Sequence, residues 1–231
     1  MDEKHGDFRE HDNAYCYPQT NVLINKLNIT DYRTLCDVEG AIVSYEIASL
    51  SVVPIKGNFD FRHLKDIHFK LFGRIYDWAG KTRNCAIAKK DLFCLPQHID
   101  GYANDIFSRL AKNDYYIDLG YEATILALVR LLADINALHP FREGNGRAQR
   151  EFIKELGRIN GIDFSLENIN QTSMIIASHD SLNGNYQKLT ELYLKNAVAI
   201  DTEEQIKMIE SYIKAEKLQS QLIKALGKRL N

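Results

Sequence analysis

The residues best suited to chemistry lie together in one short stretch, HPFREGNGRAQR, at positions 139–150. Gly144, Asn145 and Gly146 are compact and tolerate positive φ, so successive backbone N–H groups can point inward as an anion-binding nest. That nest leads into the N-terminus of a predicted helix, where unpaired N–H groups and the helix dipole favour a phosphate. The stretch therefore predicts a phosphate-binding turn.

Charged and titratable side chains surround this turn. Arg147 and Arg150 are three residues apart, so both project from one face of the first helical turn and suit a polyphosphate through bidentate hydrogen bonds. Glu143 can hold a hard cation such as Mg²⁺, which binds through one or two carboxylates together with substrate phosphates. His139, at the end of the preceding helix, is a candidate general base.

Each of these residues also has an ordinary structural interpretation. A lone histidine is usually a satisfied polar group, a G-x-G turn is often only a connection, and two arginines commonly form a solvated face. The helix dipole, however, disfavours cations at an N-terminus unless an anion binds there. Two arginines in this position break a local rule, which is typical of functional sites.

The elements that must position these residues are mostly helical. Residues 121–138 are apolar on nearly all sides and predict a helix buried in the middle of a bundle. Two β-prone runs, 84–88 and 92–95, predict a short hairpin and are the only clear β signal. The fold class is therefore all-α with a small β-hairpin. The other helices are expected after a cap at Thr30 or Asp31, after a cap at Asp60, at 97–111, from Arg147 to a stop at Gly161, and at 165–178, 185–199 and 202–228.

Composition excludes several classes of protein. The 231 residues suit one domain, and the net charge of -2 gives no support to electrostatic binding of nucleic acid. The most apolar stretch, 121–138, carries Glu122, Arg130 and Asp134, so no membrane span is expected. The charged N-terminus predicts no secretory signal, and the four cysteines fit no zinc site. We expect a cytoplasmic protein.

The stretch at 139–150 resembles the signature of the Fic family, H-x-F-x-[D/E]-G-N-G-R-x-x-R, and matches it at every fixed position. The segments YPQTNVLINKLNI, IYDWAGKTR and SLNGNYQKL look like the flanking elements of that family in the expected order. The resemblance spans roughly residues 15–200, and we divide the chain into an N-terminal arm at 1–20, a Fic domain at 21–200 and a helical tail at 201–231. The resemblance does not cover the tail, which could mediate a dimer or bind a partner, although we expect it to pack on the domain. The matched residues are His139, Phe141, Glu143, Gly144, Asn145, Gly146, Arg147 and Arg150.

The resemblance implies a Fic-type helical bundle around a central buried helix, with a β-hairpin flap, and protein adenylyltransferase activity. Such enzymes move AMP from ATP to a Tyr, Thr or Ser hydroxyl of a target protein and release pyrophosphate. Carried over, His139 would take the hydroxyl proton and Glu143 would hold Mg²⁺. Residues 144–146 would form the anion hole, Arg147 would grip the outer phosphates, and Arg150 would complete the phosphate site.

Two further groups of residues follow from the resemblance. Ile87 and Lys89 in the flap would align a target segment by strand addition, although an ordinary edge hairpin could carry the same lysines to discourage aggregation. Asn183 and Tyr186 would lie near the adenosine end of ATP, although Tyr186 could equally be a core aromatic.

Many Fic proteins are inhibited by a glutamate, in a [S/T]-x-x-x-E-[G/N] motif, that pairs with the second motif arginine, here Arg150. Glu39-Gly40 has Leu35 where this motif has Ser or Thr, and Glu167-Asn168 has Asp163 there. We therefore expect a separate small antitoxin-like protein to supply the glutamate. The alternatives are an unregulated enzyme, or a tail that acts with a degenerate motif.

Two other functions remain open at the level of sequence. The same scaffold could transfer another group, such as phosphate, another nucleotidyl group or phosphocholine, and the intact G-N-G-R argues for AMP instead. A catalytically silent nucleotide-binding module is the other alternative, and His139 argues against it. The protein would act in the bacterial cytoplasm, or in a host cytosol if it is a secreted effector.

Overall fold

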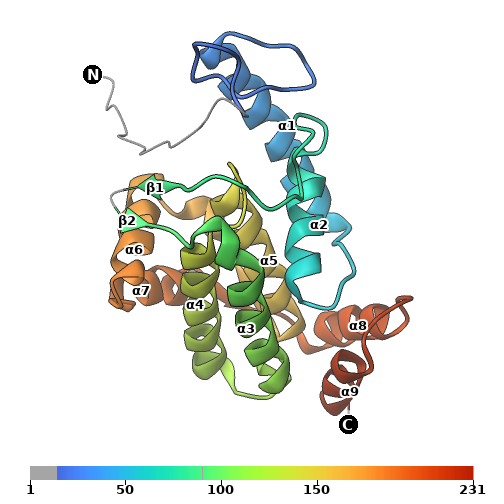
Figure 1. Ribbon diagram of the computed structural model, residues 1–231. Helices are drawn as coiled ribbons and strands as arrows, with labels where there is room; N and C mark the ends of the chain where they lie inside the picture. The colour runs from blue at the N-terminus through green and yellow to red at the C-terminus, as the bar shows by residue number, and fades with distance from the viewer. Residues whose placement is uncertain (1–14, 90, 231) are drawn as a thin grey trace.

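The computed structural model describes residues 15–89 and 91–230, with the exception of the side chains of Lys89 and Asp91, and shows a mostly helical chain (Figure 1). Short 3-10 helices lie at Pro96–His98, Asp114–Tyr116 and Leu166–Asn168. The α-helices are α1 (Tyr32–Val52), α2 (Phe61–Phe72), α3 (Ile99–Lys112), α4 (Tyr121–Leu138), α5 (Asn145–Ile159), α6 (Gln171–Leu182), α7 (Gln187–Lys195), α8 (Thr202–Ile213) and α9 (Ser220–Lys228).

Helix α4 lies at the centre of the bundle. It contacts α3, α5, α6 and α7, and Figure 1 shows it with α5 between α2 on one side and α6 and α7 on the other. Leu128 and Val129 are fully buried and Leu132 is nearly so, as the apolar pattern on all sides of this segment predicts. The predicted fold class, an all-α bundle around a buried helix, is confirmed.

Aspartate caps define the first two helices. Asp31 Oδ1 accepts the Thr34 N–H at 2.8 Å, and Asp60 Oδ1 accepts the His63 N–H at 2.8 Å. Each carboxylate thereby satisfies one N–H group that has no partner inside the helix. Of the two caps proposed for α1, Asp31 is the one that the structure uses.

The sequence analysis is wrong about the amount of β structure. The flap pairs β1 (Ala88–Lys89) with β2 (Asp91–Leu92), and a second antiparallel sheet pairs β3 (Ile162–Phe164) with β4 (Ala197–Ala199). Strands of three residues that pair across two intervening helices leave no periodic signal in the sequence. Because β4 occupies 197–199, α7 ends at Lys195 instead of 199. The helix expected at 165–178 is α6, which begins at Gln171 after a cap by Asn170.

The tail folds as two helices instead of the single helix expected at 202–228. Helix α8 ends at Ile213, and Lys217, in the turn between the two helices, has a left-handed φ of 66°. Ile209 in α8 and Leu222 and Leu226 in α9 are fully buried, so the tail packs on its own domain as expected. Lys228 pairs with Asp114 beyond α3.

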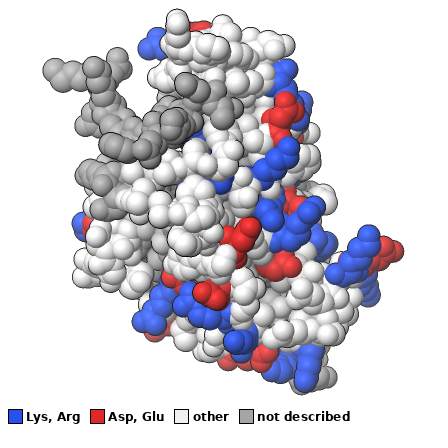
Figure 2. Space-filling model, viewed as in Figure 1, with Lys and Arg blue, Asp and Glu red and all other residues white. Residues whose placement is uncertain are grey.

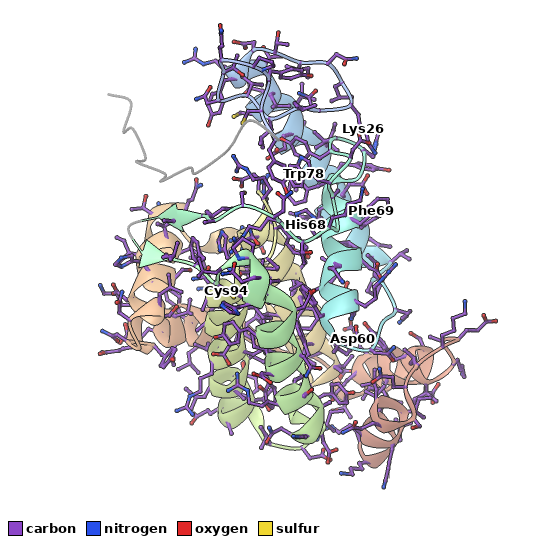
Figure 3. All side chains as sticks on the ribbon, in the orientation of Figure 1. Lys26, Asp60, His68, Phe69, Trp78 and Cys94 are labelled. Carbon is purple, nitrogen blue, oxygen red and sulfur yellow. The ribbon has the colours of Figure 1, made fainter. Side chains whose placement is uncertain are left out.

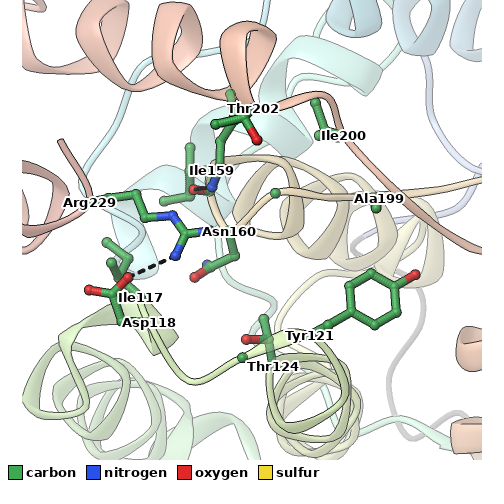
Figure 4. A pocket seen from close by; sticks show the side chains of 13 residues that line it. Ile117, Asp118, Tyr121, Thr124, Ile159, Asn160, Ala199, Ile200, Thr202 and Arg229 are labelled. Atoms are coloured by element: carbon green, nitrogen blue, oxygen red, sulfur yellow. Dashed lines mark hydrogen bonds and ion pairs between the residues drawn. The ribbon is translucent and has the colours of Figure 1, made fainter.

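A cavity of about 200 Å³ lies between this tail, the start of α4 and the end of α5 (Figure 4). Thr124, Asn160 and Thr202 line it, and the ion pair between Arg229 and Asp118, at 3.0 Å, lies at its side. Since α4 begins here and ends next to His139, the cavity lies about 27 Å from the motif, the length of that helix.

Acidic and basic side chains are interspersed along the right-hand side and the lower part of the face shown in Figure 2, and much of the rest of that face is uncharged. Across residues 15–89 and 91–230, we find no helix with the length and apolar character that crossing a membrane requires.

Candidate functional site

The loop between α4 and α5 is held by its own side chains. His139 ends α4 with φ 44° and ψ 59°, a left-handed conformation that reverses the chain direction. Beyond it, the Asn145 amide accepts the Phe141 N–H at 2.8 Å and donates to the Phe141 carbonyl at 2.7 Å. The Asn145 side chain therefore braces the loop, and its backbone N–H, which we predicted to help form the anion hole, lies at the N-terminus of α5.

Gly144 is required at the start of α5 for two reasons. Its φ of 79° is left-handed, and a Cβ at this position would lie 2.3 Å from the Phe72 ring. The Gly144 N–H donates to Glu143 Oε1 at 2.8 Å, so one amide of the predicted nest is already engaged. Within the described residues no side chain caps α5, and the Asn145 and Gly146 amides remain at its first turn.

The two motif arginines have different surroundings. Arg147 Nη1 contacts Glu39 Oε1 at 2.7 Å, its Nη2 lies 3.5 Å from Glu143 Oε1, and its guanidinium packs over the Phe72 ring. Arg150 is partly buried and forms no ion pair with a carboxylate in the part of the chain that the structure describes. Burial lowers the pKa of the Arg150 guanidinium from its usual value. A partly buried cation that has no acidic partner among the described residues favours an incoming anion.

The His139 ring is nearly buried and stacks on the Phe93 ring with 3.7 Å between centroids. Its Nδ1 lies 3.3 Å from the Asn136 carbonyl oxygen. Because a carbonyl only accepts, this contact places a proton on Nδ1 and leaves the lone pair on Nε2. That is the tautomer a general base needs.

Arg83 connects the flap to the end of α4. Its guanidinium donates to the carbonyl oxygens of His139 at 2.7 Å and of Cys85 at 2.6 Å, and also to that of Cys94. The Cys94 N–H in turn donates to the Ala137 carbonyl at 3.1 Å, and Figure 3 shows Cys94 where the flap returns to the bundle. Arg83 is 3% exposed, so a single buried guanidinium is hydrogen-bonded to both ends of the flap and to the loop at His139.

His68 of α2 supports the loop from the other side. The Gly80 N–H donates to its Nδ1 at 2.9 Å, so its Nε2 carries the proton and donates to the Glu143 carbonyl at 2.9 Å. Burial lowers the pKa of His68 to about 4, which keeps the ring neutral. Figure 3 shows His68 close to Trp78, from the IYDWAGKTR segment. The resemblance of that segment to a flanking element is the only sequence signal for the support of the motif loop by His68. The sequence analysis missed His68, Arg83 and Phe93.

The remaining predicted residues lie on the flap and beyond α6. Ile87 is partly buried, and its carbonyl accepts the Phe93 N–H at 3.2 Å. Lys89 lies in β1 opposite Asp91. Asn183 ends α6 and is exposed, and Tyr186, at the start of α7, is 37% exposed and so is not a core aromatic. Both residues lie where the chain passes from α6 to α7, two helices that pack against α4.

The donors present suit a magnesium ion only in combination with phosphate. Among the described residues, no group of three or more His, Cys, Asp or Glu side chains gathers as a metal site. Glu143 is a single carboxylate whose side chain is 42% exposed. Mg²⁺ bound by one carboxylate, substrate phosphates and water fits this arrangement.

Comparisons with known proteins agree with the motif geometry. A model of the Fic/DOC family matches residues 58–156. A probable protein adenylyltransferase, y4lH of Sinorhizobium fredii, is 35% identical over 176 residues, which cover 75% of this chain and 90% of that protein. The chain belongs to the Fic/DOC family. Protein adenylyltransferase VbhT of Bartonella schoenbuchensis is 38% identical over 183 residues, and this chain spans only 38% of its length.

Solved Fic structures share the architecture. The BepC protein of Bartonella tribocorum, a VirB-translocated effector solved with bound AMPPNP, superposes with a TM-score of 0.78 at 25% identity. That match covers 83% of this chain and all of the BepC chain. A Fic domain of a Bep effector from Bartonella quintana, solved with bound ADP, also gives a TM-score of 0.78, at 24% identity. The helical bundle with its hairpin flap is therefore the Fic fold.

Proposed function

We propose that this Fic protein transfers AMP from ATP to a hydroxyl group of a target protein. The observation that carries the proposal is the loop at 139–150, which brings together an oriented histidine, two arginines and a helix N-terminus that no side chain of the described residues caps. Relatives named protein adenylyltransferase share 35–38% of their aligned residues with this chain. Nucleotide-bound relatives of the same fold support ATP as the donor.

The reaction balances with the groups present. The target hydroxyl oxygen attacks the α-phosphorus of ATP, the bond from that phosphorus to the bridging oxygen breaks, and pyrophosphate leaves. His139 Nε2 takes the hydroxyl proton. The Asn145 and Gly146 amides and Arg147 and Arg150 stabilise the phosphate charge, which is the main requirement of such a transfer. Glu143 would hold Mg²⁺, whose chemical contribution when bound is further neutralisation of the phosphates.

A labelling experiment tests the proposal. ATP carrying label at the α- or the γ-phosphate is incubated with the protein in a bacterial lysate. Label transferred to protein only from the α position is expected, and His139→Ala should lower the rate at least 100-fold, because a general base contributes about 10²–10⁴-fold. Label from the γ position alone would mean a kinase. Label from neither position, or full transfer by the variant, would contradict the proposal.

The target protein would dock against the flap. The two-residue strands β1 and β2 present an edge to which an extended segment can add a strand, with Ile87 and Lys89 next to it. This proposal rests on the hairpin and on the position of Phe93, whose ring contacts His139 directly after β2. A segment added here would run past the proposed base.

We also propose that a separate inhibitory protein supplies a glutamate to Arg150. Glu39, one of the two glutamates that match only the E-[G/N] part of the expected pattern, forms its ion pair with Arg147 and not with Arg150. Self-labelling by the isolated chain should therefore be detectable, and Arg150→Ala should reduce it. A chain that stays silent until residues 201–231 are removed would show that the tail inhibits in cis, and would contradict this proposal.

A further inference from the structure

An acidic side chain from α1 reaches the proposed phosphate site. Glu39 Oε1 lies 2.7 Å from Arg147 Nη1, although the two residues are far apart in the chain. The Glu39 side chain is 13% exposed and that of Arg147 is 26% exposed. Water screens this sheltered ion pair less than it screens an exposed pair. The contact therefore holds the two side chains in a fixed relative orientation.

Both partners of this pair are themselves held in place. The Tyr76 hydroxyl donates to Glu39 Oε2, and the Tyr76 ring is 1% exposed and stacks on Trp78 with 4.4 Å between centroids. Burial, together with the nearby Glu39 charge, raises the pKa of Tyr76 above its usual value, so the phenol remains a donor. On the other side, the Arg147 guanidinium lies 4.6 Å from the centroid of the Phe72 ring.

The pairing leaves hydrogen-bond donors on Arg147. A guanidinium carries five N–H groups, and Glu39 engages Nη1 only. If Glu39 blocked the proposed phosphate site, it would have to move before phosphate could bind. Glu39 lies inside the 21-residue helix α1, and a few residues further along Glu46 of the same helix pairs with Lys70 of α2 at 2.8 Å. Its backbone is fixed, and its carboxylate is fixed by Tyr76.

We propose that Glu39 is a positioning residue that holds the Arg147 guanidinium in the orientation that meets the outer phosphates of the nucleotide. The inference rests on the proposed function, in which Arg147 contacts those phosphates. Groups that hold a binding residue from behind determine how well it is oriented before the ligand arrives. The carboxylate also offsets a cation placed at a helix N-terminus, where the dipole disfavours it.

The test compares Glu39→Gln with Asp37→Asn. The glutamine keeps an oxygen that can accept from Tyr76 but loses the charge that holds Arg147. Asp37 is an exposed acid on the same helix, so Asp37→Asn makes the same change in net charge away from Arg147. Thermal unfolding first establishes that both variants fold. Binding of inorganic tripolyphosphate and of AMP is then measured by calorimetry, with and without Arg147→Ala.

Glu39→Gln should weaken tripolyphosphate binding at least threefold and leave AMP binding within twofold, and Asp37→Asn should change neither. Removal of a negative charge would by itself strengthen the binding of an anion. Weaker binding by Glu39→Gln would therefore come from the lost positioning of Arg147. In the Arg147→Ala background, Glu39→Gln should have no further effect. Tighter binding by Glu39→Gln would identify a blocking acid and overturn the inference, as would equal losses with and without Arg147.

The same variants separate this inference from the proposed function. At saturating ATP, transfer of α-label by Glu39→Gln should fall about tenfold. A wild-type chain that binds tripolyphosphate but transfers no AMP would contradict the proposed function, and the binding comparison would still decide the role of Glu39. A wild-type chain that does not bind tripolyphosphate would overturn the inference.

Discussion

Two histidines lie on opposite sides of the motif loop, and their surroundings give them different properties. His139 is oriented by Phe93 and the Asn136 carbonyl so that Nε2 carries the lone pair. His68 is fully buried, and both of its ring nitrogens are used to join the loop at Glu143 to the loop at Gly80. One histidine is arranged for proton transfer, and the other for structure.

The structural role of His68 predicts a pH dependence. Its pKa in the folded protein, about 4, lies below the ordinary value of 6.5 expected in the unfolded chain. The unfolded chain therefore binds this proton more readily than the folded protein does. The contribution of His68 to stability is complete above the unfolded pKa and is lost as the pH falls towards 4. Between these limits the free energy of unfolding should fall by about 1.4 kcal/mol per pH unit from this group.

Urea unfolding measured between about pH 7 and pH 5 checks this slope. The His68→Gln variant provides the control, because an amide can still donate to the Glu143 carbonyl but does not titrate. Its pH dependence should be shallower than that of the wild type. Equal slopes in the two proteins would mean that another group is responsible.

At the level of elements, the site depends on a close approach between α2 and α5. Gly144 starts α5 directly against the Phe72 ring at the end of α2, and Arg147 one turn later lies over the same ring. The first turn of α5 is thereby seated on an aromatic surface. Any side chain larger than hydrogen at position 144 separates the two helices.

Gly144→Ala should lower the free energy of unfolding by on the order of 3 kcal/mol, because it combines a left-handed backbone with overpacking against Phe72. Nucleotide binding should fall with it. Gly101→Ala in α3 is the matched control: a Cβ there meets nothing within 4 Å, so the variant should be more stable by up to about 1 kcal/mol. Chemical unfolding of both variants measures these changes in free energy. A Gly144→Ala variant as stable as the wild type would contradict the steric argument.

The sequence predicts these elements unevenly, for physical reasons. Helix α2 follows from its apolar periodicity and its Asp60 cap, and α4 follows from apolar residues on nearly all of its sides. The motif residues follow from their types and spacing. Strands β3 and β4 are too short to show a period. The contacts of His68, Arg83 and Glu39 join residues far apart in the chain, and no local pattern specifies such contacts. The motif itself was predicted, while the residues that support it were not.

For the molecule as a whole, the tail is part of the core. Leu222, Ala225 and Leu226 of α9 and Tyr212 of α8 belong to the same buried cluster as the central helix. Phe59, directly before α2, stacks on Tyr212 with 5.5 Å between centroids. Residues outside the segment matched by the family model therefore help to support the helices that carry the site.

Leu222→Ala should destabilise the whole protein by about 2–5 kcal/mol, the usual cost of such a truncation in a packed core. Leu230→Ala, at an exposed position of the same tail, should change stability by less than about 0.5 kcal/mol. One cooperative unfolding transition is expected in both variants. A separate early transition for Leu222→Ala would show instead that the tail unfolds independently.

Arg83 has a consequence for how a target could be selected. Because its guanidinium bonds to carbonyls at both ends of the flap and to that of His139, the three segments form one mechanical unit. A peptide that distorts the hairpin as it docks would also displace the backbone of the proposed base. Poorly matched targets would then be discriminated against in the rate of the chemical step, even where they bind as tightly as good ones.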